Sequence, residues 1–328
     1  MRIIDASNVT KDYLIPEKRQ GFKGTLRHFF ARDNKIVTAV NSLNLQINSG
    51  EIVGFIGSNG AGKTTTLKML CGLIHPSTGQ INVAGHCPAL RERGFLEKIT
   101  LVMGQKQQLI WDLPPIESLK VNAAVYGLTD REASKRIDEL ASMLELNNEL
   151  IRPVRKLSLG QRMKAELLAS LLHRPSILFL DEPTLGLDIN AQIRVREFLK
   201  EYNKNYGATI LLTSHYMADI SSLCKRVVLI DKGSVIHDGS LIKLSQVVSP
   251  TRSVSIELFE KIPRHNFLEF GEIIKYDGYL LEILISKSNL TEMLSRLLIT
   301  FPIKDLEVKD PPIEQIIGKV LRSGKSYS

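Results

Sequence analysis

The chain has 328 residues, of which 43% are hydrophobic and 24% are charged, and this ordinary globular mixture excludes a disordered chain. Its 43 Lys and Arg residues against 35 Asp and Glu residues give a formal charge of +8, which suits nucleic acid, phosphorylated ligands or an anionic membrane surface without choosing among them. The three cysteines show no paired metal or redox spacing, which favours a reduced, cytosolic compartment.

Two strand-like runs, at residues 1–13 and 40–56, flank a segment of different character. Residues 16–36 are rich in Lys and Arg, and the apolar side chains among them recur at helical spacing. These side chains are Phe22, Leu26, Phe29 and Phe30. We expect a short basic amphipathic helix, which either docks on the inner membrane leaflet or on a partner protein, or packs on its own domain with its charged side in solvent.

The central part of the chain alternates strands with helices. A helical pattern follows residue 64, and a helical subdomain is expected over about 106–173. Continuous apolar runs of the buried-strand kind come next, at 176–180, 209–213 and 226–230. This alternation predicts an α/β fold with a mostly parallel sheet.

After Lys243 the pattern changes to that of a small α+β domain. Its expected strands are 253–259, 279–286 and 303–308, and its expected helices are 289–298 and 312–321. We therefore expect two domains, at residues 1–243 and 244–328.

A glycine-rich loop joins the apolar run that ends at Ile56 to the helix that follows. The loop consists of Gly57, Ser58, Asn59, Gly60, Ala61, Gly62, Lys63 and Thr64. This is the phosphate-binding pattern, in which glycines let backbone N–H groups turn inward around phosphate oxygens and the helix adds its positive end. We expect Lys63 to reach the β- and γ-phosphates and the Thr64 hydroxyl to ligate Mg²⁺.

The buried strand at 176–180 ends in two carboxylates, Asp181 and Glu182. The C-terminal edge of a parallel sheet places them beside the glycine loop. We expect Asp181 to hold Mg²⁺ and Glu182 to orient or deprotonate the attacking water. An apolar strand that ends in two acids is weak evidence alone, but together with the loop it predicts a nucleoside triphosphatase.

The subclass follows from the sequence Leu157-Ser158-Leu159-Gly160-Gln161, which resembles the signature of ATP-binding cassette (ABC) ATPases, usually Leu-Ser-Gly-Gly-Gln. Three further motifs stand in the order of that family. Gln105 matches the Q-loop glutamine, Asp188 matches the D-loop and His215 matches the switch histidine. The resemblance covers about residues 3–240.

The resemblance implies a head-to-tail dimer, with ATP between the glycine loop of one copy and the signature of the other. Ser158 and Gly160 would then contact the γ-phosphate across the dimer. His215 would hold the γ-phosphate from the near side, and Gln105 would sense both Mg²⁺ and the lytic water. The other residues that the resemblance places on the nucleotide are Thr65, Gln161 and Asp188.

Two positions depart from the family pattern. Tyr13 stands where the family has an aromatic ring that stacks on adenine, but the basic segment interrupts the usual spacing, and a surface or core tyrosine is the alternative. Leu159 stands where the family usually has glycine. It would be strained at positive φ and tolerated in a helix, so a cassette that binds ATP without hydrolysing it is a weaker alternative.

The resemblance is to ATPase subunits of bacterial exporters, and implies a chain that energises transport through separate permease subunits at the cytoplasmic face of the cell membrane. No stretch reaches the roughly 20 apolar residues of a membrane span. In the family the permease docks near residues 105–119, although the Trp111 ring could equally pack within the helical subdomain. By the same resemblance, the second cassette is a copy of this chain or a paralogue, and the C-terminal domain aids dimerisation or regulation.

A soluble cassette ATPase of translation, DNA repair or chromosome maintenance is the rival class, and the basic charge keeps it open. Such proteins usually carry two cassettes or a long coiled-coil insertion, and this sequence shows neither. We therefore expect no nucleic acid partner.

Overall fold

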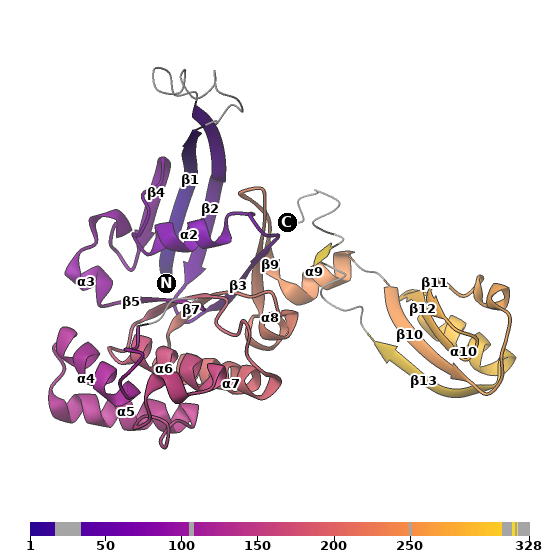
Figure 1. Ribbon diagram of the computed structural model, residues 1–328. Coiled ribbons are helices and arrows are strands. Elements are labelled where there is room, and N and C mark those ends of the chain that lie inside the picture. The colour runs from indigo at the N-terminus through magenta and orange to yellow at the C-terminus, as the bar shows by residue number, and fades with distance from the viewer. Residues whose placement is uncertain (17–33, 105–107, 249–250, 310–316, 319, 321–328) are drawn as a thin grey trace, which may run out of the picture. The chain divides into compact units, whose positions relative to one another are not determined.

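The computed structural model describes residues 1–16, 34–104, 108–248, 251–309, 317–318 and 320 (Figure 1). The chain divides into two compact units, Met1–Asp238 and Gly239–Tyr327. Each unit has its own hydrophobic core.

A six-stranded sheet forms the centre of the first unit, in the order β5-β6-β7-β3-β8-β9. Its strands are β3 (Ile52–Gly57), β5 (Ile99–Met103), β6 (Ile177–Asp181), β7 (Thr209–Thr213), β8 (Arg226–Asp231) and β9 (Ser234–Ser240). β3 pairs in parallel with β7 and β8, and β6 pairs in parallel with β5 and β7. All of β7 and residues 177–180 of β6 are buried, as expected for parallel strands that are covered on both faces. The predicted α/β fold is confirmed.

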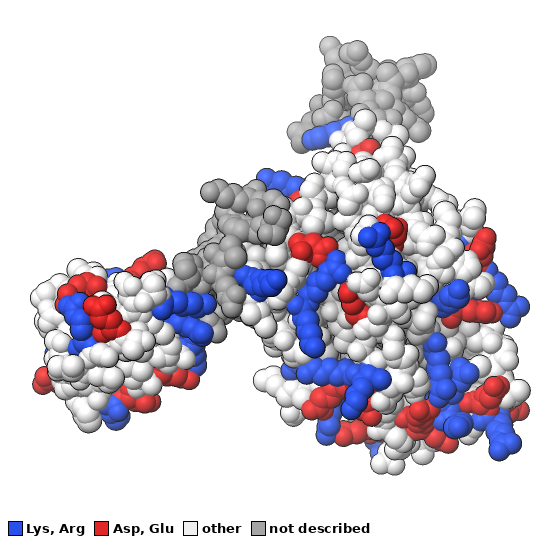
Figure 2. Space-filling view, turned by 180° about the vertical axis from the view of Figure 1, so that it is seen from behind, with Lys and Arg blue, Asp and Glu red and all other residues white. Residues whose placement is uncertain are grey.

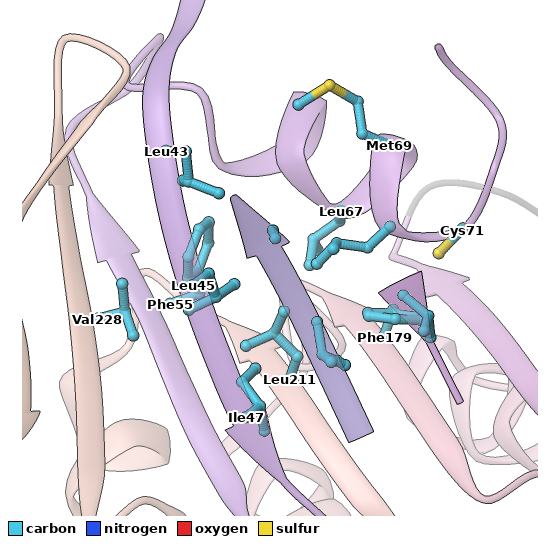
Figure 3. Packing of buried hydrophobic residues seen from close by; sticks show 14 of the residues in the cluster. Leu43, Leu45, Ile47, Phe55, Leu67, Met69, Cys71, Phe179, Leu211 and Val228 are labelled. Carbon is cyan, nitrogen blue, oxygen red and sulfur yellow. The ribbon is translucent and has the colours of Figure 1, made fainter. Parts of the chain in front are cut away.

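A separate antiparallel sheet, in the order β2-β1-β4, packs against the same core. Its strands are β1 (Arg2–Pro16), β2 (Asn34–Asn48) and β4 (Thr78–Val83). Figure 3 shows Leu43 and Leu45 of β2 near Phe55 of β3, with Leu67 of α2 (Lys63–Leu70) and Leu211 of β7 in the same cluster. The two sheets and α2 therefore share one hydrophobic core, and the glycine loop connects two elements of that core.

β1 and β2 are longer than the sequence pattern indicated. They pair from Arg2 opposite Asn48 to Pro16 opposite Asn34. Pro16 and residues 34–36, which were expected at the ends of the amphipathic helix, are strand residues instead. β-Branched residues such as Ile36 favour this extended conformation. The rest of the expected helix, 17–33, lies outside the described residues.

The described helices of the first unit complete the fold. Besides α2, they are α3 (Arg93–Leu96), α4 (Pro115–Val125), α5 (Asp130–Leu144), α6 (Leu159–Leu171), α7 (Ile189–Tyr206) and α8 (Met217–Leu223), with 3₁₀ turns at Pro88–Leu90 and Val154–Lys156. α4, α5 and α6 pack on one another, in the region expected to form a helical subdomain. α5 starts at a capping box between Thr129 and Glu132, which satisfies free N–H groups of its first turn.

The second unit contains a four-stranded antiparallel sheet, in the order β11-β12-β10-β13. Its described elements are α9 (Leu241–Val248), β10 (Thr251–Leu258), a 3₁₀ turn at Arg264–Phe267, β11 (Glu272–Tyr276), β12 (Leu280–Ser286), α10 (Leu290–Thr300) and β13 (Ile303–Lys309). Alternate residues of the sheet, such as Val254, Ile256 and Ile283, form the core together with Phe267 and Leu297. Most of the expected closing helix, 312–321, lies outside the described residues.

Candidate active site

The glycine loop runs from the end of β3 to the start of α2, and two of its glycines are required by close contacts. A Cβ atom on Gly57 would lie 2.2 Å from the carbonyl oxygen of Ile230, and one on Gly62 would lie 2.4 Å from that of Ala39. Gly62 also has a φ of +104°, which residues with a side chain rarely adopt. The loop is therefore held against β2 and β8, and its shape depends on these glycines.

Lys63 is the first residue of α2, and its side chain is buried among the loop residues. Its Nζ donates hydrogen bonds to the carbonyl oxygens of Gly57, at 2.7 Å, and Ser58, at 3.0 Å. Burial lowers the pKa of the Lys63 ammonium, while the carboxylates of Glu182 and Asp181 act in the opposite direction. The loop thus holds a cation close to two acids of another strand.

Asp181 ends β6 and joins three elements through its two carboxylate oxygens. The Thr64 hydroxyl donates to Asp181 Oδ2 at 2.8 Å, and the Thr213 hydroxyl donates to Asp181 Oδ1 at 2.6 Å. Thr64 belongs to α2 and Thr213 ends β7. The structure therefore brings together the hydroxyl and the carboxylate that the sequence assigned to Mg²⁺.

Glu182 follows β6 in an unusual backbone conformation, with a φ of +56°. A non-glycine residue in this region is strained by about 1 kcal/mol or more. Two hydrogen bonds at 3.1 Å hold it there, from Glu182 N–H to the carbonyl oxygen and to the hydroxyl oxygen of Thr213. Gly104 is close as well, because a Cβ there would lie 2.6 Å from the Glu182 carbonyl oxygen. This turn directs the Glu182 side chain to His215, whose Nε2 lies 2.8 Å from Glu182 Oε1.

Ser158 is the N-cap of α6, the helix of the signature. Its hydroxyl oxygen accepts a hydrogen bond from Gln161 N–H at 3.2 Å, and Gln161 Oε1 accepts one from Ser158 N–H at 3.0 Å. Leu159 is the first residue of the helix and is not among the residues with positive φ. Of the two alternatives for Leu159, strain at positive φ or tolerance in a helix, the structure shows the second.

Gly160 packs against the start of α7, the helix that Asp188 caps. A Cβ on Gly160 would lie 2.8 Å from the Cβ of Ala191, and Asp188 Oδ1 accepts a hydrogen bond from Ala191 N–H at 2.9 Å. The N-termini of α6 and α7 open on a cavity of about 570 Å³. Ser158, Gly160, Gln161 and Asp188 line it together with Lys164 and Arg194, among others. The lining residues include none of the glycine loop.

The remaining expected site residues are placed less directly. Tyr13 lies in β1 opposite Val37, half-buried, and Lys11 Nζ lies 5.2 Å from the centroid of its ring. Thr65 lies in the first turn of α2. In the loop itself, Ser58, Asn59 and Gly60 are exposed and Ala61 is buried. Gln105 lies outside the described residues.

Sequence reasoning missed Thr213 and Gly104, which hold the backbone and carboxylate of the two acids. Thr213 directly precedes the Ser214-His215 pair and ends a buried strand, so its place next to the acidic strand end was the available signal. Nothing in the sequence marked Gly104, because its role arises from the approach of Glu182 across the sheet edge.

Two general features bear on how the chain works. Within the residues that the structure describes, none of the helices combines the length and the apolar character that a membrane crossing requires. On the face of the molecule seen in Figure 2, Lys and Arg side chains are interspersed with Asp and Glu.

Two family models match the chain. The model described as ABC transporter matches residues 40–185, and the model described as EvrA-like ABC transporter, C-terminal domain, matches residues 250–309. Two solved structures are similar in fold. The ATP-binding subunit of an ABC transporter gives a TM-score of 0.61 at 26% identity, over 75% of this chain and 92% of that one. A dimeric ATP-binding cassette in a post-hydrolysis state, bound to ADP and Pi, gives a TM-score of 0.60 at 25% identity. The match covers 72% of this chain and 98% of that one.

Curated relatives cover most of the chain. The ABC transporter ATP-binding protein NatA of Bacillus subtilis is 36% identical over 212 residues, which are 65% of this chain and 86% of NatA. The bacitracin transport ATP-binding protein BcrA of Bacillus licheniformis is 31% identical over 287 residues, which are 88% of this chain and 82% of BcrA. The chain therefore belongs to the ABC transporter family and is an ATP-binding, ATP-hydrolysing subunit of that family.

Proposed function

We propose that ATP hydrolysis by this chain uses Mg²⁺ as cofactor and drives export through separate membrane permease subunits. One observation carries the proposal: two functional pairs converge at the C-terminal ends of β6 and β7. The Thr64 hydroxyl lies 2.8 Å from the Asp181 carboxylate, and His215 lies 2.8 Å from Glu182. A hydrolytic site needs both, because one pair can hold a metal ion and the other can handle water and phosphate.

The residues present fit Mg²⁺. This ion takes oxygen ligands and is bound by one or two protein groups together with substrate phosphates, and Thr64 and Asp181 offer one hydroxyl and one carboxylate at the start of α2. When bound, Mg²⁺ neutralises charge on the phosphates of ATP. The two Asp181 hydrogen bonds fix both of its oxygens, so the carboxylate is already oriented.

We assign the chemistry to residues of this chain as follows. Lys63 and the N–H groups of the glycine loop, with the helix start behind them, bind the phosphates. Glu182 orients the attacking water and accepts its proton. His215 holds both the Glu182 carboxylate, at 2.8 Å, and the γ-phosphate. Gln105 is proposed to contact the metal and the water on the basis of its sequence position alone.

Ser158 and Gly160 are proposed to act on ATP that is bound to a second cassette. They open on a cavity that none of the glycine-loop residues line. A head-to-tail dimer is the arrangement in which the glycine loop of one cassette and the signature residues of the other can contact the same ATP. Support comes from the similar cassette that was solved as a dimer with ADP and Pi. The capped N-termini of α6 and α7, with Gln161 and Asp188, would then face the γ-phosphate. The second cassette is a copy of this chain or a paralogue.

The segment 108–113 is the proposed docking site of the permease. Its exposed apolar side chains are Ile110, Trp111 and Leu113. Glu166 of α6 accepts hydrogen bonds from the N–H groups of Gln108, at 2.8 Å, and Leu109, at 3.3 Å, and the guanidinium of Arg162 lies 5.2 Å from the centroid of the Trp111 ring. A displacement of this segment would therefore be passed to α6, the helix that Ser158 caps.

Export is the proposed direction because the relatives with named cargo include a bacitracin transport protein and a Nod factor export protein. We place the chain at the cytoplasmic face of the cell membrane, attached through the permeases. The exposed Leu14, Ile15 and Ile36 beside the basic segment 17–33 support an additional contact with the inner leaflet. Tyr13 is proposed to stack on adenine, and the domain 244–328 to aid dimerisation or regulation.

The direct test compares ATP hydrolysis by wild type, Glu182→Gln and Glu92→Gln, with and without Mg²⁺. Glu92 is the matched control, because it also pairs with a histidine at 2.8 Å, His86, outside the site. We expect Mg²⁺-dependent turnover in wild type and Glu92→Gln and a loss of at least about 100-fold in Glu182→Gln. Turnover that is insensitive to Glu182→Gln would refute the assignment. Recovery from membranes together with integral membrane chains tests the transport role, and recovery with ribosomes or DNA instead would overturn it.

A further inference from the structure

Asp219 of α8 is a buried carboxylate to which the proposed mechanism gives no role. Its side chain is 0% exposed. Oxygen Oδ2 accepts two hydrogen bonds, from the Thr184 hydroxyl at 2.5 Å and from the Ser214 hydroxyl at 2.6 Å. Oxygen Oδ1 lies 3.0 Å from Nη1 of Arg196. Every one of these partners belongs to a segment that carries a candidate site residue.

One end of this network lies beside His215. The Ser214 hydroxyl donates to Asp219 and accepts a hydrogen bond from Tyr216 N–H at 3.0 Å, and Asp219 N–H donates to the Tyr216 carbonyl oxygen at 3.0 Å. The backbone on both sides of His215 is therefore fixed by Asp219, directly or through Ser214. The His215 ring itself stays 43% exposed and free to meet a ligand.

The other end lies beside Glu182. Thr184 follows it by two positions and is buried, with its hydroxyl on the same Asp219 oxygen that Ser214 uses. Asp219 Oδ2 thus holds both the segment that follows Glu182 and the segment that precedes His215. The side chains of Glu182 and His215 lie 2.8 Å apart. Arg196 extends the network to α7, the helix that starts after Asp188.

Apolar side chains also attach α8 to the sheet. Ile220 packs on β3, since a Cβ on Gly54 would lie 3.2 Å from two of its side-chain atoms, and Leu223 is also buried. A charge without solvent is costly unless it is paired and hydrogen-bonded, and here Arg196 and two hydroxyls meet that need. The hydrogen bonds of Asp219 therefore add to the apolar packing of α8 and lead to the segments of Glu182 and His215.

We propose that Asp219 is a positioning residue for hydrolysis, which sets the geometry of the His215–Glu182 pair through Ser214 and Thr184. The inference rests on the proposed ATPase function. It predicts that a change at Asp219 slows hydrolysis without weakening ATP binding, because Lys63 donates its hydrogen bonds to Gly57 and Ser58 of the glycine loop, whereas Asp219 is bonded to Thr184 and Ser214.

The test measures ATP affinity and the single-turnover rate of hydrolysis in the full-length chain. Asp219→Asn removes the charge that pairs with Arg196, and its NH₂ group either faces the Arg196 guanidinium, which can only donate, or forces the two hydroxyls to turn from donors into acceptors. Ser214→Ala removes one tether and leaves the Asp219–Arg196 pair in place. Each variant is expected to lower the rate about tenfold or more and to change the Kd for ATP less than about threefold. Asp238→Asn, which breaks another Asp–Arg pair of this unit, is expected to stay within about twofold of wild type.

A double-mutant cycle separates positioning from general damage. If Asp219 acts through His215, Asp219→Asn lowers the rate less than about twofold in a His215→Ala background. An equal loss in both backgrounds, or a wild-type rate in Asp219→Asn, would overturn the proposal. Should Asp219→Asn fail to fold, Ser214→Ala decides in the same way, and a wild-type rate for it overturns the proposal. A wild-type chain without Mg²⁺-dependent hydrolysis would refute the proposed function instead.

Discussion

The imidazole Nε2 of His215 and the carboxylate Oε1 of Glu182 are 2.8 Å apart. They follow β7 and β6, which are neighbours in the parallel sheet, so their carboxyl ends meet at one edge. Thr213, the last residue of β7, joins the two strand ends, because its hydroxyl donates a hydrogen bond to Asp181 and accepts one from Glu182 N–H. The positive φ of Glu182 turns its side chain out of line with the strand and towards His215.

His215→Ala is expected to lower the single-turnover rate of ATP hydrolysis about 100-fold, because Glu182 and the γ-phosphate lose their common partner. ATP affinity should stay near the wild-type value, since Lys63 and the glycine loop are unchanged. Fluorescent nucleotide binding and rapid-quench kinetics measure the two quantities. His86→Ala, which removes the histidine of the other Glu–His pair, serves as the control. A wild-type rate in His215→Ala would contradict the role assigned to this residue.

Leu159→Gly restores the usual family residue and is expected to leave hydrolysis within about threefold of wild type while lowering stability by about 1 kcal/mol. Leu159 is helical, where glycine is less favourable than leucine. Its side chain also covers the D-loop, since a Cβ on Gly186 would lie 3.3 Å from Leu159 Cδ2. Thermal unfolding and ATP turnover of wild type and Leu159→Gly measure these two effects. A large gain of turnover in Leu159→Gly would instead support the view that leucine impairs the signature.

Gly57→Ala is expected to destabilise the first unit by at least about 2 kcal/mol and to abolish ATP binding, because the added methyl would meet the Ile230 carbonyl oxygen. Gly85→Ala is the comparison. It has a φ of +84° and nothing within 4 Å of an added Cβ, so only backbone strain of about 1 kcal/mol is expected. Chemical denaturation and nucleotide binding measure both effects. Equal losses in the two variants would show that the contact with Ile230 does not matter.

Glu51→Gln is expected to reduce stability at neutral pH and to have little effect in acid. Burial alone would raise the pKa of Glu51, but hydrogen bonds from Asn48 and the guanidinium of Arg226 outweigh it and lower the pKa from 4.5. A carboxyl whose pKa is lower in the folded state stabilises the fold above its unfolded pKa, and this contribution is lost as the pH falls through the folded pKa. The melting temperature of Glu51→Gln should therefore lie below that of wild type at pH 7, and the two melting temperatures should converge at about pH 3. A pH-independent difference would contradict this expectation.

The sequence predicted the main strands of the parallel sheet because burial on both faces leaves continuous apolar runs. The runs at 209–213 and 226–230 correspond to β7 and β8 nearly residue for residue. It did not show that β1, β2 and β4 form a sheet of their own, because strand pairing joins residues as distant as Ile4 and Val83. β4 escaped notice since its residues are largely exposed and polar, and β9 since its mostly half-buried residues are polar or small apart from Val235 and Ile236.

The candidate site was predictable where a motif fixes both chemistry and position, as at Lys63 and Asp181. The hydrogen bonds of Thr213 and the network around Asp219 could not be predicted from the sequence. They depend on which strand ends meet and on the distance between α8 and Thr184 in the folded chain. A single aspartate within the turn-and-helix sequence after His215 has no sequence pattern of its own. The helical state of Leu159 was one of two alternatives, and the capping box of Ser158 and Gln161 decides it.

The place of β3 in the sheet has a consequence for synthesis of the chain. β3 lies between β7 and β8, so the glycine loop that it carries leaves the ribosome well before the strands that flank it. Gly57 reaches its final contact only when Ile230 arrives. Long-range pairing of this kind delays folding and leaves apolar strands exposed to chaperones and proteases in the meantime. We therefore expect ATP to stabilise a nearly complete first unit, which would make nucleotide binding a late step in the folding of the protein rather than its nucleus.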